Sequence, residues 1–220
     1  MGKQIVIALS MAGLLAFAAV AHGQPAQRIR GDVVAFEGHN LTVKTGSGSV
    51  VTVRLADTVR VSARSAANLG VIVAGTFIGT TAIPQPDGTL SAVEVHIFPE
   101  SMRGTGEGHR PMDTEPGSTM TNATVTSVAP AGRKAASTMT NATVADIATS
   151  GSAQRISLKY KDGEKIVIVG STVPVVMVEP GDVSMLTPGV QIVVTATKQL
   201  DGALTSDRVS VGKNGLVPPI

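Results

Sequence analysis

An internal repeat is the feature that most constrains how this chain can fold. Residues 81–97 (TAIPQPDGTLSAVEVHI) align without a gap to residues 195–211 (TATKQLDGALTSDRVSV), at an offset of 114 positions. Weaker similarity extends upstream of both stretches. Self-similarity at a fixed offset is typical of a duplicated structural unit. We therefore predict two copies of one module, at residues 28–99 and 141–212.

The hydrophobic pattern within each copy predicts β-strands. In residues 50–55, Val51, Val53 and Leu55 alternate with polar side chains, and residues 155–160 and 93–97 alternate in the same way. A period of two places one face of a strand in a core and the other in water, and β-branched residues favour this conformation. The sequence thus predicts an all-β fold of short strands.

About five strands in each copy of roughly 70 residues favour a small barrel of the OB type, with a split sandwich as the alternative. We expect two OB-like antiparallel five-stranded barrels in tandem. Each would carry one short helical turn between its third and fourth strands. These turns are expected within residues 62–69, which are rich in alanine, and within residues 182–186.

Three Asp-Gly pairs mark expected hairpin turns, because these residues accept positive φ angles. They are Asp87-Gly88, Asp162-Gly163 and Asp201-Gly202.

The N-terminus reads as a secretory signal peptide covering residues 1–23. Lys3 precedes an apolar run at residues 5–20, and Ala19-Val20-Ala21 supplies the small residues of a cleavage site. We expect cleavage near residues 21–23 and a mature protein in the periplasm or secreted. The alternative is an anchor helix that is retained. No later stretch has the ~18 apolar residues that a membrane span needs.

The segment between the copies, residues 100–140, is rich in Gly, Pro, Ser and Thr and is expected to be a poorly packed linker. Within it, STMTNATV occurs at residues 118–125 and again at 137–144. The second occurrence leads into the expected first strand of the second copy. The first is either an alternative strand start or the remnant of a local duplication. Residues 213–220 are expected to be a C-terminal tail.

The order T-V-x-V, a short turn, T-A-x-x-Q-x-D-G-x-L and V-x-V resembles a family of exported bacterial domains of unknown function. The most characteristic run spans residues 82–111, from Ala82-Ile-Pro-Gln-Pro to His109-Arg-Pro. The resemblance covers about two thirds of the chain. It implies OB-like domains, often in tandem, and an exported protein. Its motifs are turns and strand ends, so it implies no chemistry.

A group of histidine, carboxylate and thioether side chains suggests a site for copper or zinc. Glu94 and His96 are two positions apart on one expected strand, so they share a face, and similar residues follow within a short distance. Imidazole, carboxylate and thioether ligands together suit a borderline or soft ion. The alternative is a polar strand face followed by a loop. The candidate residues are Glu94, His96, Met102, Glu107, His109 and Met112. Met120 and Met139 extend the methionine set.

Composition restricts the remaining functions. The absence of cysteine excludes a disulfide framework and a cysteine nucleophile, and only 2% of the residues are aromatic. Few aromatic platforms and a net charge of +2 argue against nucleic acid binding. No nucleophile elbow, zinc-protease motif or dinucleotide loop occurs, so we predict no enzymatic activity and no catalytic residues.

The favoured function is therefore an exported, non-catalytic binding or scaffold protein, whose partner is a periplasmic protein or a small ligand. The alternative is a periplasmic copper- or zinc-handling accessory that uses residues 94–112. Without that metal, no cofactor is expected.

Overall fold

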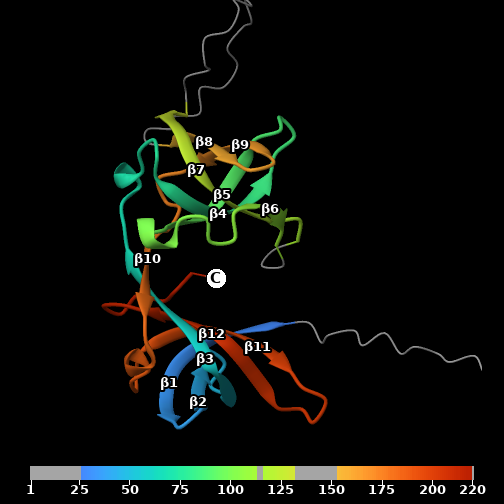
Figure 1. Cartoon of the computed structure of the whole chain (residues 1–220), viewed down its shortest axis with the longest axis vertical. Helices are drawn as coiled ribbons and strands as arrows, with labels where there is room; N and C mark the ends of the chain where they lie inside the picture. Colours follow the sequence, from blue (N-terminus) through green and yellow to red (C-terminus); the bar gives the residue numbers. More distant parts are fainter. Residues whose placement is uncertain (1–25, 113–115, 132–152, 220) are drawn as a thin grey trace, which may run out of the picture.

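The computed structural model describes residues 26–112, 116–131 and 153–219 (Figure 1). The expected signal peptide, Met139 and the second STMTNATV stretch lie outside these residues. Within them the chain forms twelve strands, three 3-10 turns and no α-helix, so the predicted all-β class is confirmed. The strands are β1 (Gln27–Glu37), β2 (Asn40–Thr45), β3 (Val50–Ala66), β4 (Phe77–Pro84), β5 (Leu90–Ile97), β6 (Gly108–Pro111), β7 (Thr119–Pro130), β8 (Gln154–Tyr160), β9 (Gly163–Val169), β10 (Val175–Gly181), β11 (Gln191–Lys198) and β12 (Leu204–Gly212).

Five of these strands form a closed barrel in the order β1-β2-β3-β12-β11. Strand β11 returns to β1, with Gln27 opposite Ala196. All neighbours in this ring are antiparallel except β3 and β12, which run parallel. The barrel is therefore mixed, and the expectation of purely antiparallel pairing is wrong.

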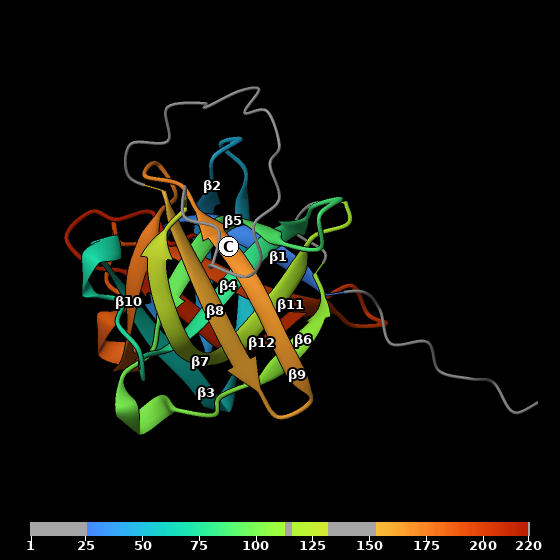
Figure 2. The same cartoon turned by 90° about the horizontal axis from the view of Figure 1, so that it is seen from above.

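A second lobe lies above the barrel in Figure 1 and contains β5, β4, β7, β8 and β9. Its neighbours are antiparallel along that order. Strands β9 and β5 then meet in parallel over two residue pairs, Leu90 with Val167 and Ser91 with Ile168. Figure 2 looks onto this lobe with β7, β8 and β9 in view. The pairing thus follows the same order as in the barrel.

Each lobe contains strands from both copies of the repeat, which corrects the expected arrangement of one barrel per copy. The barrel takes β1 to β3 from the first copy and β11 and β12 from the second. The second lobe takes β4 and β5 from the first copy and β8 and β9 from the second. The boundaries 28–99 and 141–212 therefore describe the repeat in sequence and do not coincide with the groups of paired strands.

The length of β3 is the physical reason for this exchange. It runs for 17 residues, about 55 Å at ~3.3 Å per residue, whereas strands usually have 3–10 residues. Such a strand extends beyond one small barrel and delivers the following β4 and β5 to the other lobe. Figure 1 shows β3 and β10 running between the lobes.

The two copies cross where β3 pairs with β10. In this antiparallel pair Arg64 lies opposite Val178, and these positions are separated by 114, the offset of the repeat. Pairing between equivalent positions is the signature of a local two-fold relation. The two halves of the chain are thus related by a pseudo-two-fold axis at this crossing.

Two hydrophobic cores result, and each contains side chains from both copies. In the barrel, Leu41 and Val53 of the first copy pack with Ile192 and Val209 of the second. In the second lobe, Ile78 of the first copy packs with residues of β8 and β9. Neither copy therefore holds a complete core.

The expected linker, residues 100–140, contains regular structure and corrects that prediction. Glu100–Met102 is a 3-10 turn, η2, and β6 and β7 follow. Strand β7 contains the first STMTNATV stretch and pairs with both β4 and β8. Its Met120, Ala123 and Val125 are buried. This segment occupies in the second lobe the position that β1 occupies in the barrel.

Hairpins occur at all three predicted Asp-Gly pairs, and at two of them the glycine has a positive φ angle. Gly88 and Gly202 have φ angles of 81° and 86°. The Asp87 and Asp201 carboxylates accept hydrogen bonds from the backbone N–H groups of Thr89 and Ala203, at 3.0 and 2.9 Å. Asp162 and Gly163 do join β8 to β9, but Gly163 has no positive φ. That turn therefore does not require glycine for its backbone conformation.

Short helical turns occur between the third and fourth strands of each copy. The second, η3 (Val183–Met185), lies within the expected residues 182–186, where Asp182 caps it by accepting from the N–H of Ser184 at 2.8 Å. The first, η1 (Leu69–Val71), begins at the end of the expected range because residues 62–66 continue β3.

An engineered disulfide tests the exchange of strands. In the parallel β3–β12 pair, Arg54 lies beside Thr205, and neighbouring strands are ~4.8 Å apart, within the Cα separation that a disulfide spans. We expect an Arg54→Cys/Thr205→Cys variant to form an intramolecular disulfide on oxidation, detected by mass spectrometry.

The control is Arg54→Cys/Ser91→Cys, because Ser91 is the position equivalent to Thr205 in the first copy. The natural chain has no cysteine to compete. A disulfide in the control, with none in the test variant, would show instead that each copy forms its own barrel.

Candidate functional site

A cavity of about 580 Å³ lies between the barrel and the second lobe. The barrel side is formed by residues of β1, β3, β11 and β12. The opposite side comes from β5, η2, β6, β7 and β10. Its volume lies within the 300–1,000 Å³ that is usual for ligand pockets, and such pockets favour the boundary between two structural units.

Arginine dominates the polar part of this cavity. Five guanidinium groups line it, and none of the described lining residues is acidic. They belong to Arg28, Arg60, Arg64, Arg110 and Arg208. Serine and threonine hydroxyls from the barrel face lie among them, those of Ser62, Thr195 and Ser210. The cavity therefore offers several cationic donors and neutral hydroxyls to one ligand.

One carboxylate, that of Asp207, holds two of these arginines. Asp207 accepts from Nη2 of Arg60 at 2.7 Å and from Nε of Arg208 at 3.1 Å. These hydrogen bonds, first that from Arg208, lower the pKa of Asp207. All three side chains are exposed, so these ion pairs orient the arginines more than they stabilise the fold.

Arg64 is the most enclosed of the group. Its Nη1 donates to Oγ of Ser62 at 3.2 Å, but its buried Nε has no hydrogen-bond partner among the described residues. Burial lowers the pKa of Arg64, and the carboxylate of Glu94 partly opposes that shift. An unpaired buried donor on a charged group costs free energy unless a ligand completes it.

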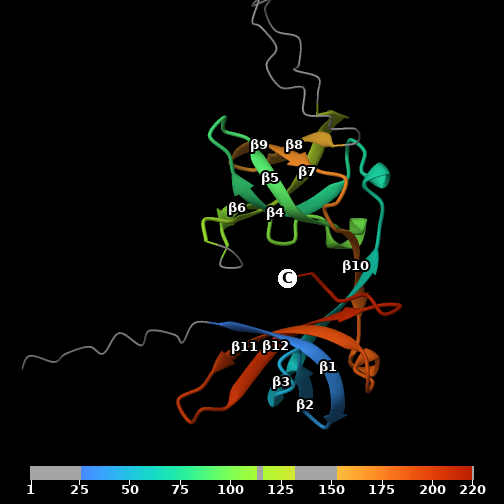
Figure 3. The same ribbon diagram turned by 180° about the vertical axis from the view of Figure 1, so that it is seen from behind.

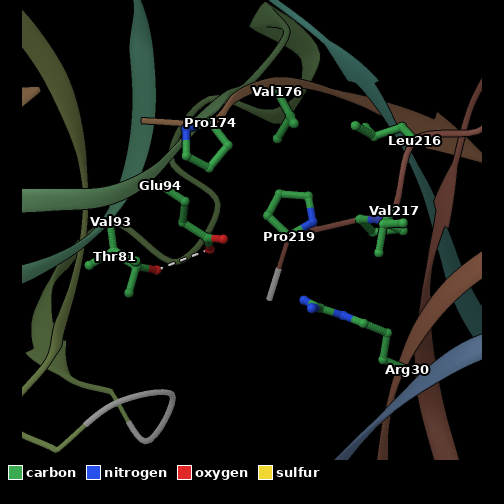
Figure 4. A pocket seen from close by; sticks show the side chains of 10 residues that line it. Arg30, Thr81, Val93, Glu94, Pro174, Val176, Leu216, Val217 and Pro219 are labelled. Atoms are coloured by element: carbon green, nitrogen blue, oxygen red, sulfur yellow. Dashed lines mark hydrogen bonds between the residues drawn. The ribbon is translucent and has the colours of Figure 1, made fainter. Parts of the chain in front are cut away.

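A second, smaller cavity of about 350 Å³ lies on the other side of the C-terminal tail. Figure 4 shows Arg30 of β1 and Glu94 of β5 on opposite sides of Pro219. Pro219 lines both cavities, and Figure 3 shows the C-terminus between the lobes. The tail thus divides the space between the lobes into two compartments.

The two cavities occupy equivalent places in the two copies of the repeat. Positions 60, 62, 195 and 208 of the larger cavity correspond, at the offset of 114, to positions 174, 176, 81 and 94 of the smaller one. Thr195 of the larger cavity and its equivalent Thr81 of the smaller one are the same residue type. The other residues differ, with Arg60, Ser62 and Arg208 replaced by Pro174, Val176 and Glu94. Basic character is therefore concentrated in one of the two compartments.

The six candidate metal ligands are divided among different places. His96, Met102 and Met112 line the large cavity, together with Met120. Glu94 lines the smaller one. Glu107 and His109 lie in a separate cavity beside Tyr160. Within residues 26–112, 116–131 and 153–219, no three His, Cys, Asp or Glu side chains form a group suited to a metal ion.

Glu94 and His96 share a face of β5, as their spacing predicts, and both are buried. Oε1 of Glu94 accepts from Oγ1 of Thr81 at 3.1 Å. Nε2 of His96 lies 3.2 Å from the same oxygen, but without the alignment of a hydrogen bond. This pair lies at the boundary between the two cavities.

His109 makes contacts of a structural kind. Its Nδ1 lies 2.8 Å from Oγ1 of Thr121, and its ring stacks on Tyr160 with centroids 6.4 Å apart. Burial, followed by the charge of Lys165, lowers the pKa of His109. The nearby Glu107 accepts a hydrogen bond from the backbone N–H of Lys161 at 3.1 Å.

No family model, curated protein or solved structure matches this chain. The resemblance to exported bacterial domains therefore stays a prediction. Among the described residues, no helix has the length and apolar character needed to cross a membrane.

The sequence alone does not show that the arginines of the large cavity lie together. Arg60, Ser62 and Arg64 alternate with Val61 and Ala63, which is the signal of a strand with one polar face. That signal was obscured because the alanine-rich run from residue 62 favoured a helical turn. Arg28, Arg110 and Arg208 join them only through the exchange of strands.

Replacing Arg64 by methionine tests whether this guanidinium serves the fold or the cavity. Methionine keeps much of the volume and removes a partly unpaired buried charge, so Arg64→Met is expected to raise the free energy of unfolding by about 1 kcal/mol. Urea denaturation followed by circular dichroism measures the change, with Arg155→Met as the control. A loss of more than about 2 kcal/mol would assign Arg64 a structural role instead.

Proposed function

We propose that this protein is an exported, non-catalytic binding protein that holds a small anionic ligand between its two lobes. The observation that carries the proposal is the set of five arginines around one cavity whose described lining contains no acidic residue. Arginine is well suited to carboxylate and phosphate groups because its planar guanidinium donates two parallel hydrogen bonds.

The comparison of the two repeat copies supports this choice. An arrangement that served folding alone would leave both compartments similar. Instead, the positions of Arg60 and Arg208 in the large cavity are occupied by Pro174 and Glu94 in the smaller one. The unpartnered Nε of Arg64 supports it as well, because an oxyanion would supply the missing acceptor.

A small molecule suits the cavity better than a nucleic acid. Proteins that bind single strands combine a basic groove with several aromatic platforms. Phe98 is the one aromatic ring, besides the imidazole of His96, among the described lining residues. A separate periplasmic protein remains the other partner class that the sequence predicts.

We also propose that each lobe is an OB-like unit. The barrel combines three strands of the first copy with two of the second, and the second lobe combines two strands of each copy with β7 from the segment between them. Five paired strands and a short turn between the third and fourth strands of each copy support this. Export to the periplasm follows from the sequence of residues 1–23. N-terminal sequencing of the mature protein tests it, and a start between residues 22 and 24 is expected.

The copper or zinc function is the second candidate, because His96 and three methionines line the same cavity. The five surrounding arginines disfavour a cation there, since like charges repel. Calorimetric titration with Cu⁺ and Zn²⁺ distinguishes the two functions. Saturable heat that is lost in His96→Ala would favour the metal over the anion.

Titration calorimetry with inorganic phosphate and with acetate tests anion binding. We expect saturable binding that weakens with added sodium chloride, because salt screens the attraction. Arg64→Met and Arg208→Gln should each weaken it by about tenfold or more, since a hydrogen bond to a charged group contributes ~1.5–3 kcal/mol.

The matched control is Arg155→Gln, which removes the same charge from β8 outside this cavity. Unchanged affinity is expected there. Equal losses in the control and the two cavity variants would place the anion elsewhere on the protein.

A further inference from the structure

The large cavity has an apolar side that an inorganic anion would leave unused. Phe98 and three methionines form it on the side of the second lobe, and Val178 and Val193 adjoin them. The methionines are Met102, Met112 and Met120. All four side chains belong to residues 98–120, most of which the sequence predicts to be a linker.

The apolar and basic sides are in direct contact. Nη2 of Arg28 lies 3.9 Å from Sδ of Met112, and Arg110 of β6 lies opposite Met120 in the pairing with β7. A ligand held by the guanidinium groups would therefore place the rest of its body against thioether and aliphatic side chains.

The type of apolar residue also carries information. Methionine is unbranched and polarisable, and it adapts to ligands of different shape. Phe98 is held more rigidly, since its ring packs on Phe77 with centroids 5.6 Å apart and an interplanar angle of 51°. The apolar side thus combines one fixed ring with three adaptable side chains.

Resting on the proposed function, we infer that the ligand is an anionic amphiphile, with an acidic head group at the arginines and an aliphatic body against the methionines. Carboxylate and phosphate heads share the chemistry that the arginines recognise. The cavity volume of about 580 Å³ limits the length of the aliphatic body.

A homologous series tests this inference. Calorimetry is performed with acetate, butyrate, hexanoate, octanoate and decanoate below their micelle concentrations, and with butyl and octyl phosphate. Affinity is expected to rise about fourfold with each added methylene until the cavity is filled, the value for burying one CH₂ group. The two phosphate esters show which head group the arginines prefer.

Variants locate the aliphatic body. Met102→Gln and Met112→Gln replace partly buried thioethers by polar side chains of similar length, and each should flatten the rise with chain length while acetate affinity stays unchanged. Leu200→Gln is the control, because Leu200 is fully exposed at a hairpin turn, and it should behave as the natural protein.

The outcomes separate the inference from the proposal beneath it. Binding of acetate and phosphate with no dependence on chain length overturns the amphiphile and leaves the anion site in place. Absence of binding for every member of the series overturns the anion site itself. A rise with chain length that persists in both methionine variants places the aliphatic body elsewhere and overturns the inference.

Discussion

The parallel pairing of β3 with β12 is the interaction on which the rest of this structure depends. It joins the first copy of the repeat to the second over eight residue pairs, from Val53 with Leu204 to Arg64 with Gly212. Without the β3–β12 pairing the barrel would have an open edge, where backbone N–H and C=O groups lack partners. Because β12 closes the barrel, β11 pairs with β1, and the second copy must supply two strands to the barrel core.

The space between the lobes follows from that exchange. The crossing of β3 and β10 at Arg64 and Val178 places equivalent outward faces of the two copies opposite each other. A duplicated chain thereby obtains two related compartments. They differ in the side chains at equivalent positions and in the additional segments that line them, residues 98–120 in the larger and the C-terminal tail in the smaller. Arg208 and Glu94 show how far the equivalent positions have diverged. The two-fold relation thus explains why two similar compartments form, and the different side chains at equivalent positions explain why one of them is basic.

The sequence predicts the local features well and the long-range pairing poorly, for a physical reason. Alternation in residues 50–55, the Asp87 and Asp201 turns and the repeat itself depend on neighbours along the chain, which a sequence displays directly. Which of two equivalent strands closes a barrel depends instead on contacts between residues that are far apart in the chain. Both β5 and β12 carry the same pattern, so strand pairing within a copy and between copies satisfies the same rules. The group of arginines could not be predicted for the same reason, since its members lie together only because strands of the two copies are exchanged.

The partly buried guanidinium of Arg64, whose Nε is enclosed, indicates that the space between the lobes is more than a by-product of this exchange. Its equivalent in the other copy is Val178, so an apolar side chain satisfies the same backbone position at the crossing. Desolvating a charge costs several kcal/mol, and a hydrophobic replacement is often neutral or stabilising. An arginine whose Nε lacks an acceptor among the described residues is therefore expected to lower the stability of the fold. In the complex that we propose, a ligand oxyanion would accept a hydrogen bond from that Nε and recover this free energy, which would link the least favourable feature of the folded chain to the affinity of the proposed site.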